Sequence, residues 1–260
     1  MSAEPPVVAG IYFADICSGV GGVAAELVRL GSPCREFDTS HGESGDITRP
    51  WVVRRLCQDA ASGKLQGACF APPCGTFSAA LFWSGRLRSR DEPWGLSDLT
   101  EKQRVKVDHA NSVIRAVINI IKDLNRYRIP WIIENPWQSL LWWIPFFTDM
   151  MSTPYVHRIV SDFCRFGRPW RKRTVFISGH VDFQDLGRLN LQCGGTRGFC
   201  PSNQGRRHFV LEGSNERGVK WTKVAEAYPP SVSKALAFAL SSSFRSLIIN
   251  ANLNGTTFRF

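Results

Sequence analysis

The chain has 260 residues, of which 43% are hydrophobic, and it carries eight cysteines and a formal net charge of +10. This is enough apolar material for a full-sized core, in one domain or in one domain with a small appendage. The cysteines lack the spacing of a disulfide framework, which favours reduced thiols in an intracellular compartment. The basic charge favours a polyanionic partner, nucleic acid first, with a merely basic surface as the alternative.

Neither a signal peptide nor a membrane span is expected. Residues 1–9 lack a basic start followed by a long apolar stretch. The most apolar segment, residues 130–147, is interrupted by Glu134, Asn135 and two prolines. We therefore expect a monomer with no membrane partner, in the nucleus if the source is eukaryotic and in the cytoplasm if it is bacterial or viral. The start at Met1 and a closing helix favour a self-sufficient domain.

Strand-like and helix-like segments alternate along the chain. Apolar β-branched runs predict strands at 7–16, 35–38, 67–71, 131–133, 156–163 and 174–178, and amphipathic spacing predicts helices at 21–30, 51–58, 102–127 and 231–244. A polar loop is predicted over 85–100, with Arg86, Arg88 and Arg90 alternating along it. This order predicts an α/β fold with a Rossmann-like, mostly parallel, doubly wound sheet. Residues 1–178 would form the body and 179–220 a small loop-rich lobe, and 221–260 would return to the body.

A glycine-rich turn, Ser18-Gly19-Val20-Gly21-Gly22, lies between the first strand and the first helix. Glycines at this place permit positive φ angles and close approach of the backbone to a ligand. Asp38 lies at the end of the second strand, where a carboxylate commonly accepts hydrogen bonds from ribose hydroxyls. Asp46 and Ile47 are placed to receive an adenine amino group. The pattern predicts a nucleotide-like ligand, either a dinucleotide or S-adenosylmethionine.

Two later strand ends carry reactive groups. Pro72-Pro73-Cys74 follows an apolar strand, so the rigid turn holds Cys74 like a nucleophile, whereas Cys69 is expected to be an inert buried thiol. Glu134 follows three apolar residues, and partial burial at a strand end would raise its pKa and suit it to holding a proton. The alternatives are a buried structural thiol and an ordinary turn acid.

These segments, in this order, resemble the cytosine-5 DNA methyltransferase family. Asp15 with Gly19-Val20-Gly21-Gly22 matches the family's cofactor motif, and Pro72-Pro73-Cys74 with Phe77-Ser78 matches its nucleophile motif. Glu134-Asn135 matches its Glu-Asn dipeptide, and Arg171-Lys172-Arg173 resembles its paired-arginine motif. The resemblance covers residues 13–178 and the closing helix.

The resemblance implies a class I S-adenosylmethionine-dependent methyltransferase acting on DNA. Cys74 would attack C6 of a flipped cytosine, Glu134 would hold a proton against N3, and Arg171 or Arg173 would contact the base carbonyl or a phosphate. The residues implied in S-adenosylmethionine binding are Asp15, Cys17, Ser18, Gly19, Val20, Gly21, Gly22, Asp38, Asp46, Ile47 and Pro72. Cys17 stands where the family usually has a phenylalanine that stacks on the adenine, and Tyr228-Pro229-Pro230 lacks the preceding Gly-Asn, so the chain resembles a compact, divergent branch of the family. Transfer RNA as the acceptor, and a non-catalytic nucleic-acid-binding relative, are the alternatives.

The lobe over 179–220 would occupy the position of a target-recognition region. Its basic side chains would contact phosphates or form a solvated surface; they are Arg188, Arg197, Arg206, Arg207 and His208. Cys193, Cys200 and His208 are weak metal-ligand candidates, with Cys164 as a fourth. Because no Cys-x-x-Cys pair is present, we expect no metal.

Overall fold

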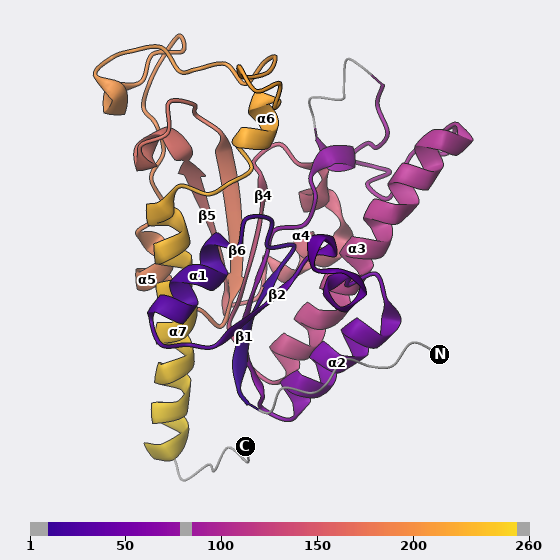
Figure 1. Ribbon diagram of the computed structural model, residues 1–260. Coiled ribbons are helices and arrows are strands. Elements are labelled where there is room, and N and C mark those ends of the chain that lie inside the picture. The colour runs from indigo at the N-terminus through magenta and orange to yellow at the C-terminus, as the bar shows by residue number, and fades with distance from the viewer. Residues whose placement is uncertain (1–9, 79–84, 254–260) are drawn as a thin grey trace.

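The computed structural model describes residues 10–78 and 85–253 (Figure 1). These residues form a six-stranded sheet with the strand order β2-β1-β3-β4-β6-β5. Its strands are β1 Tyr12–Ile16, β2 Cys34–Phe37, β3 Leu65–Phe70, β4 Trp131–Pro136, β5 Val156–Asp162 and β6 Arg173–Gly179. Strands β1 to β4 pair in parallel, whereas β6 is antiparallel to both β4 and β5. The predicted α/β, Rossmann-like, mostly parallel sheet is confirmed.

Helices cover both faces of the sheet (Figure 1). They are α1 Gly22–Arg29, α2 Pro50–Ala61, α3 Glu101–Arg126, α4 Pro145–Met150, α5 Phe183–Gly187, α6 Trp221–Val224 and α7 Pro230–Leu253. Helices α1 and α5 pack with α7, and α7 packs on β3 and β4. Helices α2 and α3 pack together on the other face, and α2 contacts β3.

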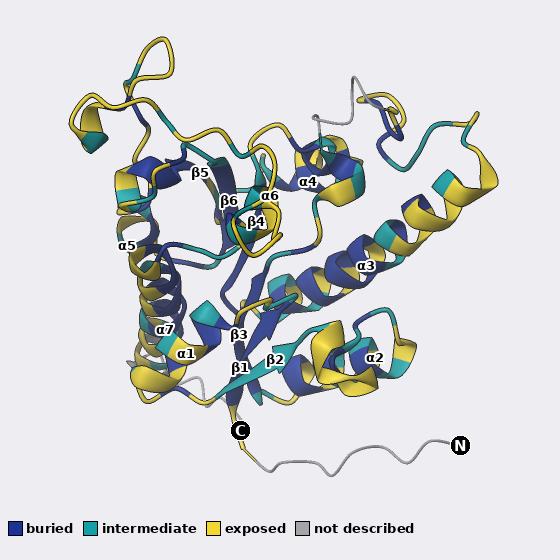
Figure 2. Cartoon of the chain, turned by 45° about the horizontal axis from the view of Figure 1, so that its top comes forward, coloured by how far each residue is buried: buried dark blue, intermediate teal, exposed yellow. Residues whose placement is uncertain are grey.

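The strands supply two apolar layers because successive side chains of a strand point to opposite faces. In β1, Phe13 belongs to the core under α1 and α7, whereas Tyr12 and Ala14 belong to the core under α2 and α3. The central strands β1 and β3 are buried on both faces and read as nearly continuous apolar runs, which is typical of a parallel sheet. Figure 2 shows the buried sheet between the inward faces of the helices.

The predicted boundaries differ most from the structure at the start of β1 and at the end of α7. Strand β1 begins at Tyr12 rather than at residue 7; Ile11 is exposed, and residues 7–9 lie outside the described ranges. The closing helix α7 runs to Leu253 rather than ending at residue 244. No proline or glycine interrupts residues 245–253, so the backbone has no reason to stop there.

Helix α7 is also the one described helix that is long and apolar enough, by length and composition, to cross a membrane. Half of its apolar window, Pro230–Ile249, is buried inside the fold. It packs against α1, β3 and β4, so its apolar composition is that of a core helix.

The stretch predicted as a lobe divides into two parts. Val181, Leu186 and Leu189 are buried in the same core as α7. Residues 190–220 are mostly exposed loops beyond this core (Figure 2), with isolated antiparallel bridges Phe199↔Arg207 and Ser214↔Lys220. We use "lobe" below for residues 190–220.

Candidate functional site

The sheet topology gathers the sequence motifs at one edge. Strands β1 to β4 are parallel, so their carboxyl ends lie together. Strand β6 runs in the opposite direction, so it starts at this edge with Arg173, and β5 ends beside it at Asp162. The order β2-β1-β3 makes the gap between β1 and β3 the point where the direction of chain progression reverses, the usual ligand position in such sheets.

The glycine-rich turn adopts the backbone that its sequence predicts. Cys17, Gly19 and Gly21 have φ angles of 58°, 57° and 66°, in the left-handed region. Asp15, 3% exposed, accepts a hydrogen bond at 3.0 Å from the backbone N–H of Ala24 in α1. Burial raises the pKa of Asp15 to about 7, while that hydrogen bond opposes the shift. Asp15 therefore links β1 to the first turn of α1 and stabilises the glycine-rich turn between them.

Acidic side chains surround this turn. Asp38 accepts a hydrogen bond at 3.2 Å from the N–H of Gly19, and another at 3.0 Å from the N–H of Ser40. Burial raises the pKa of the Cys17 thiol to about 12. The negative charges of nearby carboxylates add to this shift; they are those of Asp38, Asp15 and Asp46. Cys17 is thus a neutral thiol held among acids.

The segment Gly45-Asp46-Ile47 lies at the end of β2, in close backbone contact with Asp38. A Cβ atom on Gly45 would lie 2.2 Å from the carbonyl oxygen of Asp38, so only glycine fits there. The next residue, Asp46, accepts a hydrogen bond at 2.9 Å from the N–H of Thr48, and Ile47 is buried in the core. The structure therefore brings Asp38, Asp46 and Ile47 together beside the glycine turn.

Glu36 belongs to this group and was missed by the sequence reasoning. A Cβ atom on Gly21 would lie 2.4 Å from Glu36 Oε2, so this carboxylate lies directly against the turn. Its position near the end of β2, opposite Asp15 in the β1–β2 register, was available as a signal. Asp38 drew the prediction instead because it is the last residue of the predicted strand over 35–38.

Cys74 is half-buried on the turn that follows β3. Asn135 Nδ2, at the end of β4, donates a hydrogen bond at 2.9 Å to the carbonyl oxygen of Pro72. Burial and then the charge of Glu134 raise the pKa of the Cys74 thiol, whereas Lys172 lowers it. Cys69, on β3, is completely buried, as expected of an inert thiol.

Glu134 is 6% exposed at the carboxyl end of β4. Its Oε2 accepts a hydrogen bond at 3.3 Å from the hydroxyl of Tyr228, and Lys172 Nζ lies 4.0 Å from its Oε1. Among the described residues, Oε1 has no hydrogen-bond partner. Burial raises the pKa of Glu134, with Lys172 and Tyr228 opposing the shift. A carboxyl group in this setting is suited to holding a proton.

The predicted arginines, Arg171 and Arg173, form ion pairs with Asp162. Arg173 donates to both oxygens of Asp162, at 2.8 Å and 2.7 Å, and Arg171 Nε donates to Asp162 Oδ2 at 3.3 Å. Lys172, just before β6, instead lies beside Glu134, whereas the arginines on either side of it pair with Asp162. Sequence reasoning assigned no role to Lys172 or Tyr228, although both lie in segments that were compared with family motifs.

A cleft of about 410 Å³ lies between the Cys74 turn and the residues after β4. It is lined by Ser78, Pro136, Trp137, Gln138, Ser139, Arg171 and Arg173. The two arginines therefore contribute positive charge to a wall of this cleft, beside an exposed tryptophan. This combination is suited to phosphate contact and base stacking.

The loop over 85–100 was predicted as a polar surface segment, and one of its arginines is buried instead. Arg88, 1% exposed, donates to Thr76 Oγ1 at 3.0 Å and to Asn111 Oδ1 at 2.8 Å, and its guanidinium lies 3.7 Å from the centre of the Phe77 ring. Burial lowers its pKa to about 10. Arg88 thus links the Cys74 turn to α3, whereas Arg90 is exposed as predicted.

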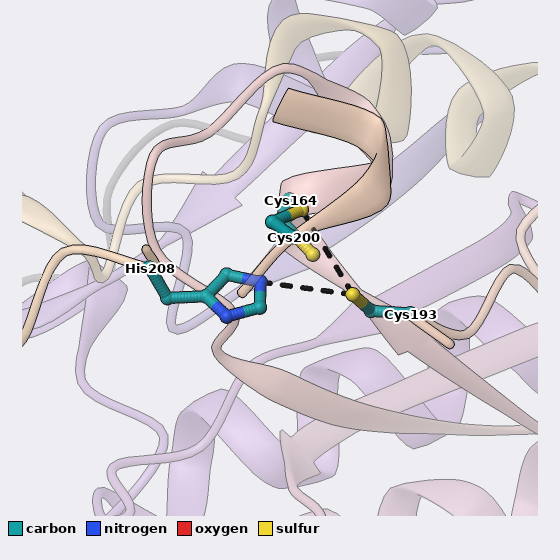
Figure 3. Close-up of side chains that lie close together, drawn as sticks. All are labelled: Cys164, Cys193, Cys200 and His208. Atoms are coloured by element: carbon teal, nitrogen blue, oxygen red, sulfur yellow. Dashed lines mark hydrogen bonds between the residues drawn. The ribbon is translucent and has the colours of Figure 1, made fainter. Parts of the chain in front are cut away.

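The weak metal-ligand candidates lie together (Figure 3). Ligand atoms of Cys164, Cys193, Cys200 and His208 all lie within 4.8 Å of one another, and the three cysteines are buried. His208 therefore points into the protein rather than toward a phosphate, contrary to the expectation for this residue. Arg197, Arg206 and Arg207 are exposed on the same lobe.

The sequence matches no protein-family model and no curated protein. Among solved structures, the chain is similar to the Entamoeba histolytica methyltransferase EhMeth, with 13% identity and a TM-score of 0.38. The similarity covers 66% of this chain and 53% of that chain, so the chain matches about half the length of that structure. The fold assignment rests on the sheet order and the helices of this chain itself.

Proposed function

We propose that this chain is an S-adenosylmethionine-dependent methyltransferase that modifies C5 of cytosine in DNA through a covalent bond between Cys74 and C6. The observation that carries the proposal is the pairing of Cys74 and Glu134 at adjacent strand ends. The Asn135–Pro72 hydrogen bond joins these two ends, at 2.9 Å. A half-buried nucleophile beside a buried proton donor is the pair of groups that activation of a pyrimidine ring requires.

The glycine turn supports the choice of cofactor. A side chain at Gly21 would collide with Glu36, and Ser18 Oγ is buried with no hydrogen-bond partner among the described residues. Glu36 and Asp38 would accept hydrogen bonds from ribose hydroxyls, and Asp46 with Ile47 would contact the adenine. S-adenosylmethionine would supply an electrophilic methyl group. With Cys17 in place of an aromatic residue, contact with the adenine would come from a smaller thiol side chain.

The proposed reaction uses Cys74 and Glu134 in turn. The Cys74 thiolate would form an S–C6 bond, which moves the C5–C6 π electrons toward C5, while a proton held by Glu134 goes to N3. C5 would then take the methyl group, with S-adenosylhomocysteine as the leaving group. A base would remove the C5 proton, the C6–S bond would break with return of the thiolate, and the N3 proton would go back to Glu134. Extrusion of the cytosine from the duplex is required before this sequence, because the ring is inaccessible in the stack.

Two groups would support Glu134. The Lys172 ammonium at 4.0 Å opposes the rise in pKa of both Glu134 and Cys74, so it stabilises the thiolate. The Tyr228 hydroxyl at 3.3 Å orients the carboxyl group. Arg171 and Arg173, on the cleft wall, would bind a phosphate or the base carbonyl while Asp162 holds them in place.

The test is transfer of labelled methyl from S-adenosylmethionine to duplex DNA and, separately, to transfer RNA. We expect label at C5 of cytosine in DNA, and a loss of at least about a thousandfold in Cys74→Ala because the nucleophile is removed. Cys57→Ser, which alters a half-buried cysteine on α2, is the matched control and should keep wild-type transfer. DNA containing 5-fluorocytosine should form a covalent complex with the wild type and with Cys57→Ser, but not with Cys74→Ala.

Other outcomes would identify the alternatives. Cysteine-dependent transfer to transfer RNA and not to DNA would change the substrate and keep the mechanism. DNA binding without transfer to either acceptor would overturn the proposal in favour of a non-catalytic nucleic-acid-binding relative. Full activity in Cys74→Ala would exclude the covalent mechanism.

A further inference from the structure

Four metal-ligating side chains meet at the base of the lobe, away from the cofactor turn. Cys164 comes from the 3₁₀ turn after β5, and Cys193, Cys200 and His208 come from the lobe. Figure 3 shows the four side chains converging on a common centre. We propose that this cluster binds one Zn²⁺ ion as a structural site, which joins the lobe to the body of the fold.

The distances between donor atoms fit a tetrahedral ion. Zn–S bonds of about 2.3 Å and Zn–N bonds of about 2.0 Å place tetrahedral ligands about 3.8 Å apart for two sulfurs and about 3.5 Å apart for sulfur and nitrogen. Cys193 Sγ lies 3.9 Å from Cys200 Sγ and 3.7 Å from His208 Nε2. A disulfide requires about 2.05 Å between sulfurs, so these thiols are not bonded to each other here.

The ligand atoms, three sulfurs and one imidazole nitrogen, favour zinc in a structural role. Three thiolates and one imidazole form a standard structural zinc set, and soft sulfur ligands disfavour Mg²⁺ and Ca²⁺. Four protein ligands complete a tetrahedron and leave no position for a reacting water. The site therefore stabilises structure and has no catalytic part.

The lobe backbone is shaped to present these ligands. The N–H of Gly195 points to Cys193 Sγ at 3.4 Å, a hydrogen bond of the kind that stabilises a metal-bound thiolate. The carbonyl of Cys200 accepts hydrogen bonds from the N–H groups of Asn203 and Gly205 at 3.1 Å and 3.0 Å, which closes a tight turn. That turn, with the bridge Phe199↔Arg207, returns the chain so that His208 lies beside Cys193.

The metal cluster is connected to the cleft through Asp162. This fully buried carboxylate accepts a hydrogen bond from the N–H of Cys193 at 2.7 Å and also holds Arg171 and Arg173. Arg171 also donates a hydrogen bond to the carbonyl oxygen of Cys193, at 3.4 Å, so a bound ion would fix Cys193 and, through these hydrogen bonds, both arginines of the cleft wall. Loss of the ion should release the lobe and loosen both arginines.

The experiment measures metal content of the full chain, purified under reducing conditions without chelators, by inductively coupled plasma mass spectrometry. We expect one zinc per chain. Replacement by Co²⁺ should give the visible d–d and thiolate charge-transfer absorptions of a tetrahedral sulfur site. Cys200→Ser and His208→Ala should each lower zinc content at least tenfold, whereas Cys57→Ser should retain it.

A second readout keeps the proposal testable if Cys200→Ser fails to fold. Wild-type protein stripped with a chelator should be cut by trypsin at Arg197 and Arg206 at least tenfold faster, with cleavage in residues 10–78 unchanged. Added Zn²⁺ should restore protection and Mg²⁺ should not. Zinc content near zero together with an absent Co²⁺ spectrum would overturn the proposal, as would a Cys193–Cys200 disulfide in peptide mapping. Because no readout depends on methyl transfer, failure here is independent of failure of the proposed function.

Discussion

At the scale of single residues, Lys172 adjusts the acid–base balance of the site. Its ammonium is 4.0 Å from Glu134 and lowers the pKa of Cys74 against the opposing effects of burial and the glutamate. A cation in this position favours the thiolate over the thiol and so favours nucleophilic attack. The residue next to it on either side instead forms an ion pair with Asp162.

Removing this charge should shift the titration of Cys74 to higher pH. Glu134 and burial then act unopposed, so the thiol holds its proton to a higher pH in Lys172→Gln. At neutral pH we expect alkylation of Cys74 by iodoacetamide to slow roughly tenfold. The measurement is the pH profile of alkylation, with Cys74 identified by peptide mass spectrometry.

The exposed Lys234 on α7 provides the matched control, since Lys234→Gln removes the same charge far from the thiol. Its profile should coincide with that of the wild type. A Lys172→Gln profile that is unchanged, or displaced to lower pH, would show that Lys172 does not stabilise the thiolate.

At the scale of elements, the loop over 85–100 fastens the nucleophile turn to α3. Arg88 spans the gap with hydrogen bonds to Thr76 on one side and to Asn111 and the carbonyl of Val107 on the other. Its stem and guanidinium pack on Phe77, which is fully buried. The turn that carries Cys74 is therefore held in place by a long-range polar contact as well as by its two prolines.

Arg88→Met should destabilise the protein and free the Cys74 turn. The methionine fills part of the same space but leaves Asn111 and the backbone carbonyls without their donor, at a cost of about 2–3 kcal/mol in the free energy of unfolding. Urea denaturation measures this loss, and faster alkylation of Cys74 in the native state reports the opening of the turn. The exposed Arg90, altered to Met, should change the unfolding free energy by less than about 0.5 kcal/mol. Equal effects of the two variants would refute this role for Arg88.

At the scale of the whole molecule, basic side chains are positioned beyond the carboxyl edge of the sheet. The lobe carries the exposed Arg197, Arg206 and Arg207, and Figure 1 shows it extending past the strand ends that bear Cys74 and Glu134. With a net charge of +10, we expect binding of DNA to be strongly dependent on salt.

Replacing these three arginines by glutamine should reduce that dependence. Each lost phosphate contact should decrease the slope of log K against log salt by about 0.9, because fewer counterions are released. Fluorescence anisotropy with a labelled duplex over a series of salt concentrations measures the slope. The matched control replaces the exposed Lys122, Arg126 and Arg128, near the opposite edge of the sheet, by glutamine. Equal slopes for the two triple variants would place DNA elsewhere on the surface.

The sequence by itself determined the order of strands and helices, the glycine turn, and the placement of Cys74 and Glu134 at strand ends. These features follow from local causes: apolar periodicity, the freedom of glycine, and the rigidity of proline. The tertiary structure alone decided which groups meet. Arg88 is buried, Lys172 rather than an arginine lies beside Glu134, and Cys164 joins three ligands from the lobe. Such contacts depend on strand pairing and chain reversal between residues far apart, and no local pattern encodes those.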